Sequence, residues 1–180
     1  MTGPQGSAES SRALIHLGRI NRWIEVVLAY LAGLCLATFT LVVLVDVIYR
    51  QVLAHPLMWP SEWSVMTFVW SVLLGASVAA RRRAHFVVEV LPALPAALDH
   101  ALRVLVVLLT LVFALVLLYF GLGMTLSGMR RFTPMMGYPM VWVFAAFPVA
   151  GLAITLFTIE QLLEVLGGHD RREQPEVQGP

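Results

Sequence analysis

The residues of this chain that could do chemistry are its histidines and a few carboxylates near the ends of apolar runs. Two histidines facing each other from neighbouring helices could ligate a haem, which would indicate the membrane anchor of a redox enzyme. The five histidines instead fall in terminal or connecting segments: His16, His55, His85, His100 and His169. We interpret them as surface or interfacial side chains, and we expect no catalytic residue, no cofactor and no metal site.

One charged pair has the spacing of a helical ion pair. Asp46 and Arg50 are four residues apart, so on a helix they share a face and can pair. Two interpretations stay open: the pair only fixes a helix end, or Arg50 also reaches Glu62 and clamps two helices together. A carrier also needs polar groups midway along its helices. Here the middles of the apolar runs are almost wholly Leu, Val, Ala and Phe, so the chain lacks the parts of a self-sufficient transporter.

The composition indicates that the elements positioning these residues lie in lipid. Of the 180 residues, 59% are hydrophobic and only 13% are charged, and the mean hydropathy is +0.81. A soluble domain is usually about half apolar and about a quarter charged. The net charge of +1 gives no indication of nucleic-acid binding, and the single cysteine, Cys35, cannot form a disulfide within the chain.

Four apolar runs are long enough to cross a bilayer, so the predicted fold class is an all-α integral membrane protein. The expected spans are 23–49, 62–80, 101–127 and 140–166. Residues 1–22 are expected to form a tail, flexible to about residue 18, with a basic helical lead-in from residue 12. Residues 167–180 are expected to form a second tail. Pro148 and Gly151 predict a kink in the last span.

The arginines predict the orientation. All basic residues counted are arginine, and with a cytoplasmic N-terminus only three of the twelve, Arg50, Arg130 and Arg131, lie outside. The positive-inside bias therefore places both termini in the cytoplasm. Between spans two and three, residues 85–103 are too polar to span and carry two prolines, which favours an amphipathic segment in the membrane interface.

The second span carries two further patterns. Small side chains form one stripe, which could line a pore but more often makes a close-packed helix seam: Ser64, Thr67, Ser71 and Gly75. Tryptophans are expected to anchor and pack the helix, and the last two of them share a face that could dock a partner: Trp59, Trp63 and Trp70. The arginines that follow are interpreted first as a topology signal and lipid-headgroup anchor: Arg81, Arg82 and Arg83.

The order of these elements resembles a known family. From Asp46 to Pro92 the chain reads DVIYR, then PLMWPSEW, then FVWSVLLGASVAARRRAHFVVEVLP. This is similar to the small membrane subunit of tripartite ATP-independent periplasmic (TRAP) transporters, the DctQ-like family. The matching elements are Asp46, Arg50, Trp59, Glu62, Gly75, Ala76, an arginine after the second span, and His85. One departure is Trp63, which occupies the second position of the family's usual acidic pair.

The resemblance implies a division of labour among three proteins. A periplasmic protein would capture an organic acid, and a large many-span subunit would carry it with sodium across the bacterial inner membrane. This chain would brace the large subunit and help dock the binding protein. Asp46, Arg50 and Glu62 would then fix the periplasmic end, and the small stripe would pack on the large subunit or an internal helix. Arg130 and Arg131 would meet an acidic patch on the binding protein or lipid headgroups. The alternatives left open are a redox-enzyme anchor and a stand-alone membrane scaffold.

Overall fold

The described part of the chain is entirely helical apart from its connections. The computed structural model describes residues 5–54, 57–86 and 96–166. Its helices are α1 (Gln5–Gln51), α2 (Trp59–Phe86), α3 (Ala96–Gly128), α4 (Val141–Phe144) and α5 (Ala146–Leu166). The stretches long and apolar enough to cross a membrane are Gly18–Gln51, Trp59–Arg82, Ala101–Gly128 and Val141–Leu163. The prediction of an all-α protein with four transmembrane helices is confirmed.

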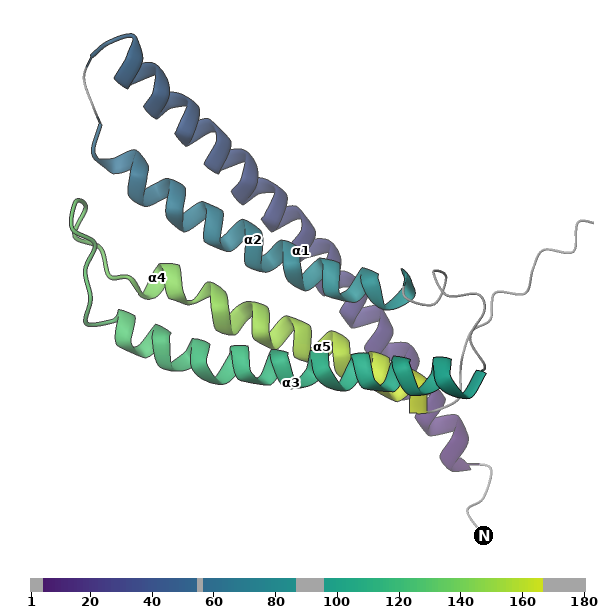
Figure 1. Cartoon of the computed structure of the whole chain (residues 1–180). Helices are drawn as coiled ribbons and strands as arrows, with labels where there is room; N and C mark the ends of the chain where they lie inside the picture. Colours follow the sequence, from purple (N-terminus) through teal and green to yellow (C-terminus); the bar gives the residue numbers. More distant parts are fainter. Residues whose placement is uncertain (1–4, 55–56, 87–95, 167–180) are drawn as a thin grey trace, which may run out of the picture.

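The helices form two antiparallel hairpins, α1 with α2 and α3 with α4 and α5 (Figure 1). The core in which they meet combines residues of α1, α2 and α5: Leu28, Leu74, Val78, Ala153 and Phe157. We call the end of the bundle where α2 and α5 finish the Arg81 end. The opposite end, where α2 and α4 begin, is called the Glu62 end. The alternating direction of the spans places the start of the α1 span and the end of α5 at the same end.

Most apolar side chains point outward from the bundle. Within the most hydrophobic 18-residue stretch of α1, no residue is buried inside the chain, and in α3 only 11% of that stretch is buried. Such faces are stable only in contact with lipid or with another apolar protein surface. The chain on its own therefore covers only a small part of its hydrophobic area.

Helix ends differ from the expected spans because apolar character and helix formation end at different residues. The expected flexible tail up to residue 18 is wrong for residues 5–18, which continue the helix of α1. Likewise α2 does not end at residue 80 but runs on to Phe86, since arginine is a good helix former. Residues 1–4, 87–95 and 167–180 lie outside the described residues, so the interfacial placement of segment 85–103 stays a prediction.

The last span is interrupted at Ala145, three residues before Pro148. Proline has no backbone N–H, so the carbonyl of Phe144, four residues earlier, cannot accept its usual helical hydrogen bond. The hydroxyl of Thr125 in α3 partly replaces it: this hydroxyl donates to the Gly121 carbonyl at 2.8 Å and also lies 3.1 Å from the Phe144 oxygen. The kink expected near Pro148 therefore takes the form of a break between α4 and α5.

Glycines allow α3 to pack closely on α4 and α5. A Cβ atom at Gly151 would lie 2.7 Å from the backbone nitrogen of Leu118, and one at Gly121 would lie 2.9 Å from that of Pro148. Gly128 has the same role, since its Cβ would lie 3.0 Å from the nitrogen of Val141. Close backbone approach of this kind is typical of helix packing in membranes.

Candidate functional site

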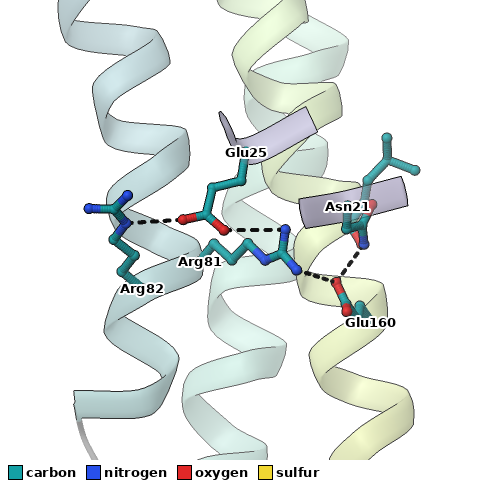
Figure 2. Close-up of polar contacts among 6 residues, drawn as sticks. Asn21, Glu25, Arg81, Arg82 and Glu160 are labelled. Atoms are coloured by element: carbon teal, nitrogen blue, oxygen red, sulfur yellow. Dashed lines mark hydrogen bonds and ion pairs between the residues drawn. The ribbon is translucent and has the colours of Figure 1, made fainter. Parts of the chain in front are cut away.

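A polar cluster joins three helices at the Arg81 end. Arg81 of α2 lies between Glu25 of α1 and Glu160 of α5 (Figure 2). Its Nη1 is 3.4 Å from Glu25 Oε2, and its Nη2 is 3.5 Å from Glu160 Oε2. Asn21 Nδ2 donates to the same Glu160 oxygen at 2.6 Å, and Arg82 Nε donates to Glu25 Oε1 at 3.0 Å. Two cations and two anions thus balance within one cluster.

The centre of this cluster is shielded from solvent. Asn21 is 1% exposed, and the side chains of Arg81 and Glu160 are 16% and 11% exposed. The guanidinium carbon of Arg81 lies 5.1 Å from the ring centroid of Phe157, within cation–π range. Nη1 of Arg81 is buried and makes no hydrogen bond, so its contact with Glu25 is electrostatic only. Removing one partner would leave a poorly solvated charge, which makes the cluster a strong constraint on helix position.

The cluster changes the interpretation of the arginine run. Arg81 turns into the bundle rather than toward headgroups, whereas the side chain of Arg82 is 68% exposed. The side chains of Arg83 and His85 lie outside the described residues. The role of the run as a topology signal remains a prediction.

At the Glu62 end, one carboxylate fixes the loop between α3 and α4. Glu62 Oε1 accepts a hydrogen bond from the backbone N–H of Met135 at 2.8 Å, and Oε2 accepts one from Met136 at 3.0 Å. Hydrogen bonds to an ionised acceptor are stronger than neutral ones. Glu62 therefore joins the beginning of α2 to the loop of the other hairpin.

The pairing of Asp46 with Arg50 is confirmed, with Nη2 of Arg50 2.6 Å from Oδ2 of Asp46. The alternative in which Arg50 clamps Glu62 is wrong. Glu62 contacts two amides of the α3–α4 loop, which offer donors directly opposite the first turn of α2. Arg50 thus belongs to the end of α1, and it is Glu62 that links the start of α2 to the loop of the other hairpin.

Tyr138 lies in the same loop, and the pKa of its phenol is affected by burial and by the charge of Glu62. Burial raises the pKa of the Tyr138 phenol, and the negative charge of Glu62 raises it further. Both effects favour the neutral phenol. A positive φ of 69° at Gly137 lets the loop turn back, so that Thr133 N–H donates to the Tyr138 carbonyl at 2.9 Å. The loop is therefore a defined turn with Glu62 as its anchor.

The small stripe of α2 is partly an internal seam. Thr67 and Ser71 are 6% and 7% exposed, and their hydroxyls donate to carbonyls of their own helix at 2.8 Å. Ser64 does the same toward Ser61 at 2.9 Å. Gly75 has no atom within 4 Å of its Cβ position, so it makes no close packing within the chain. Hydroxyls satisfied in this way offer no polar path along the helix.

The tryptophans divide between packing and exposure. Trp70 Nε1 donates to the carbonyl of Trp142 at 2.8 Å, which joins α2 to α4. Trp59 and Trp63, by contrast, are 40% and 39% exposed at the Glu62 end. Among the described residues, no group of three or more His, Cys, Asp or Glu lies close enough to hold a metal ion.

Comparison with known proteins agrees with this architecture. Residues 39–168 match the family model described as tripartite ATP-independent periplasmic transporters, DctQ component. The chain is 26% identical over 132 residues to the sialic acid TRAP transporter permease protein SiaT of Haemophilus influenzae, covering 73% of this chain and 21% of that protein. It is 29% identical over 113 residues to the C4-dicarboxylate TRAP transporter small permease protein DctQ of Vibrio cholerae, covering 59% of this chain and 49% of that protein. The chain thus spans about half or less of the length of these relatives.

Proposed function

The chain belongs to the DctQ component family of tripartite ATP-independent periplasmic transporters, and we propose that it is the small, non-catalytic subunit that braces the large permease subunit. It is a multi-pass protein of the bacterial inner membrane. The family membership favours neither the redox-enzyme anchor nor the stand-alone scaffold.

The observation that carries the proposal is that the charged groups paired within the described chain join helices at the two ends of the bundle. Glu25, Arg81 and Glu160 close one end of the bundle, and Glu62 closes the other through loop amides. Between these ends the spans are apolar, and the buried hydroxyls of Thr67 and Ser71 are bonded to their own helix. Such a unit is suited to holding a shape rather than to passing a polar solute.

The proposed partner surfaces follow from exposure. The outward apolar faces of α1 and α3 would pack on a large many-span subunit and on membrane lipids. With both termini in the cytoplasm, the Glu62 end would face the periplasm. There the loop bearing Arg130 and Arg131 would meet a periplasmic solute-binding protein. Its exposed Phe132, Met135 and Met136 would add an adaptable apolar contact.

The names of the relatives support a proposal for the substrate class. The two relatives are named for sialic acid and for C4-dicarboxylates, both organic acids. We propose that the complete transporter imports an organic acid with sodium. The groups that select the acid would lie on the partner proteins, because the middles of the described spans carry no charged side chain.

Co-purification tests the proposal. The tagged full chain is extracted from its native membrane in mild detergent, and a large hydrophobic subunit is expected to elute with it in a fixed ratio. Elution as a lone, stable homo-oligomer would contradict the proposal, and a haem absorption band would support the redox-anchor alternative. Replacing both Arg130 and Arg131 by alanine is expected to lower the rate of uptake that the binding protein supports. Unchanged uptake would exclude the docking role.

A further inference from the structure

A groove runs along the outer face of α3 toward the Glu62 end. Its volume is about 670 Å³. Ser127 and Arg131 lie at one end of the groove, and Phe144 of α4 forms a wall. The rest of the lining comes from α3 and is apolar or aromatic: Tyr119, Phe120, Leu122, Gly123, Met124 and Leu126. The rings of Tyr119 and Phe120 meet edge to face at 5.4 Å at the other end.

Gly123 forms part of the groove wall and is not needed for helix packing. Gly121 and Gly128 on the same helix are contacted closely by the neighbouring segment. Gly123, by contrast, has no atom within 4 Å of its Cβ position, and it lines the groove. Its carbonyl is satisfied by Ser127 Oγ at 2.9 Å. The bare backbone therefore leaves room for an apolar chain lying along the helix.

Arg131 places a positive charge where the groove reaches the end of the span. The apolar stretch of α3 ends at Gly128, so Arg131 lies at the level of the headgroups. In the described part of the chain, Arg50, Arg81 and Arg82 pair with carboxylates, whereas no carboxylate pairs with Arg131. The neighbouring Arg130 is also exposed but does not line the groove.

The length of the groove matches half a bilayer. The helical part of the lining, residues 119–128, spans about 14 Å at about 1.5 Å per residue. Half of the hydrocarbon layer is about 15 Å thick. An acyl chain lying beside Gly123 would thus bring its phosphate to Arg131. A helix of a partner protein would instead have to supply a carboxylate at this depth, whereas a phosphate is present there in every bilayer.

We propose that this groove binds one anionic glycerophospholipid in the leaflet at the Glu62 end. Its phosphate pairs with Arg131, and one acyl chain lies along α3 over Gly123. This lipid site goes beyond the bracing function and does not depend on it. Because Arg131 pairs with lipid here, the docking contact proposed for the loop falls to Arg130, and Arg130→Ala alone separates the two proposals in the uptake assay.

Native mass spectrometry of the purified full chain tests the site, with phosphatidylglycerol and phosphatidylcholine as the added lipids. The wild-type protein is expected to retain phosphatidylglycerol in preference to phosphatidylcholine. Gly123→Leu fills the groove and Arg131→Gln removes the cation, so each is expected to lower the phosphatidylglycerol-bound fraction about fivefold. Gly33→Leu and Arg130→Gln are matched controls outside the groove, expected to change it less than about twofold. Equal binding by Gly123→Leu and the wild type, or equal losses in the controls, would overturn the proposal.

A second measurement identifies the occupant in the native membrane. A photoreactive residue replaces Leu126, which lines the groove and is 63% exposed. Cross-linking to phospholipid supports the site, and cross-linking to a protein subunit overturns it. If Gly123→Leu fails to fold, the Arg131→Gln comparison and the cross-link still decide the result.

Discussion

Arg81 and Glu160 are joined across α2 and α5, with Nη2 of the guanidinium 3.5 Å from Oε2 of the carboxylate. The same guanidinium faces Glu25 of α1, so one arginine links three helices. A planar guanidinium can meet two carboxylates at once, which the ammonium of a lysine does less well. Arg81 of α2 thus adds a link between α1 and α5 beside the direct hydrogen bond from Asn21 to Glu160.

Arg81→Gln is expected to destabilise the protein by about 2–4 kcal/mol, because the shielded Glu160 would lose its ion-pair partner and Glu25 would keep only Arg82. Arg82→Gln is the matched control. Its side chain is 68% exposed, so a loss below about 1 kcal/mol is expected. Thermal unfolding in detergent, followed by tryptophan fluorescence, measures both. Equal unfolding temperatures for Arg81→Gln and Arg82→Gln would contradict the central role of Arg81.

Glu62→Ala is expected to loosen the α3–α4 loop without unfolding the bundle. The amides of Met135 and Met136 lose their acceptor, so the peptide covering residues 130–140 should exchange hydrogen at least about tenfold faster, since hydrogen bonds to charged groups contribute about 1.5–3 kcal/mol. Hydrogen–deuterium exchange mass spectrometry measures this rate. Asp46→Asn, which changes a pair within α1, should leave the loop unaffected.

Thr125→Val is expected to cost about 0.6–1.7 kcal/mol, the usual range for a hydrogen bond between membrane helices. The change removes the hydroxyl that is shared between the Gly121 carbonyl of its own helix and the Phe144 carbonyl at the break before Pro148, and it keeps the side-chain volume. Thr110→Val provides the comparison, because the hydroxyl of Thr110 bonds only to Val106 of its own helix and is exposed. The difference in unfolding free energy between the two variants reports the interhelical bond. No difference would show that the Phe144 carbonyl needs no partner.

Gly151→Ala is expected to destabilise by about 1–3 kcal/mol through overpacking. The added methyl would lie 2.7 Å from the backbone nitrogen of Leu118, so α3 and α5 would have to move apart. Gly33→Ala on α1 meets nothing within 4 Å and should be neutral or slightly stabilising, since alanine favours helix. A stable Gly151→Ala variant would show that the contact between α3 and α5 is adjustable.

The spans could be predicted because length and hydropathy depend on each segment alone. The Asp46–Arg50 pair could be predicted for a similar reason, since a spacing of four residues determines a helical neighbour. The partners of Arg81 could not, because Glu25 and Glu160 are far from it along the chain and an arginine run has the usual appearance of a topology signal. Asn21 and Glu25, four residues apart at the start of a span, were the available signal for a buried face.

The role of Glu62 could not be predicted from the sequence either, because its carboxylate oxygens accept hydrogen bonds from backbone amides. Every residue except proline has such an amide, so the residue types give no sign of the contact. The glycines show a related limit. Gly75 and Gly151 look alike in a sequence, yet only Gly151 meets a neighbouring backbone. Which small residue packs depends on the relative rotation of the helices, and that is set by contacts between distant segments.

The position of Glu160 in α5 has a consequence for biogenesis. Helices enter the membrane in the order of synthesis, so Asn21, Glu25 and Arg81 are inserted before Glu160 exists. Until α5 arrives, Arg81 has one carboxylate instead of two, and Asn21 lacks its acceptor. The polar cluster at the Arg81 end is therefore complete only after the last helix has been inserted. A nascent chain that stalls before α5 would expose an incompletely paired polar surface, which quality-control proteases of the membrane could distinguish from the finished protein.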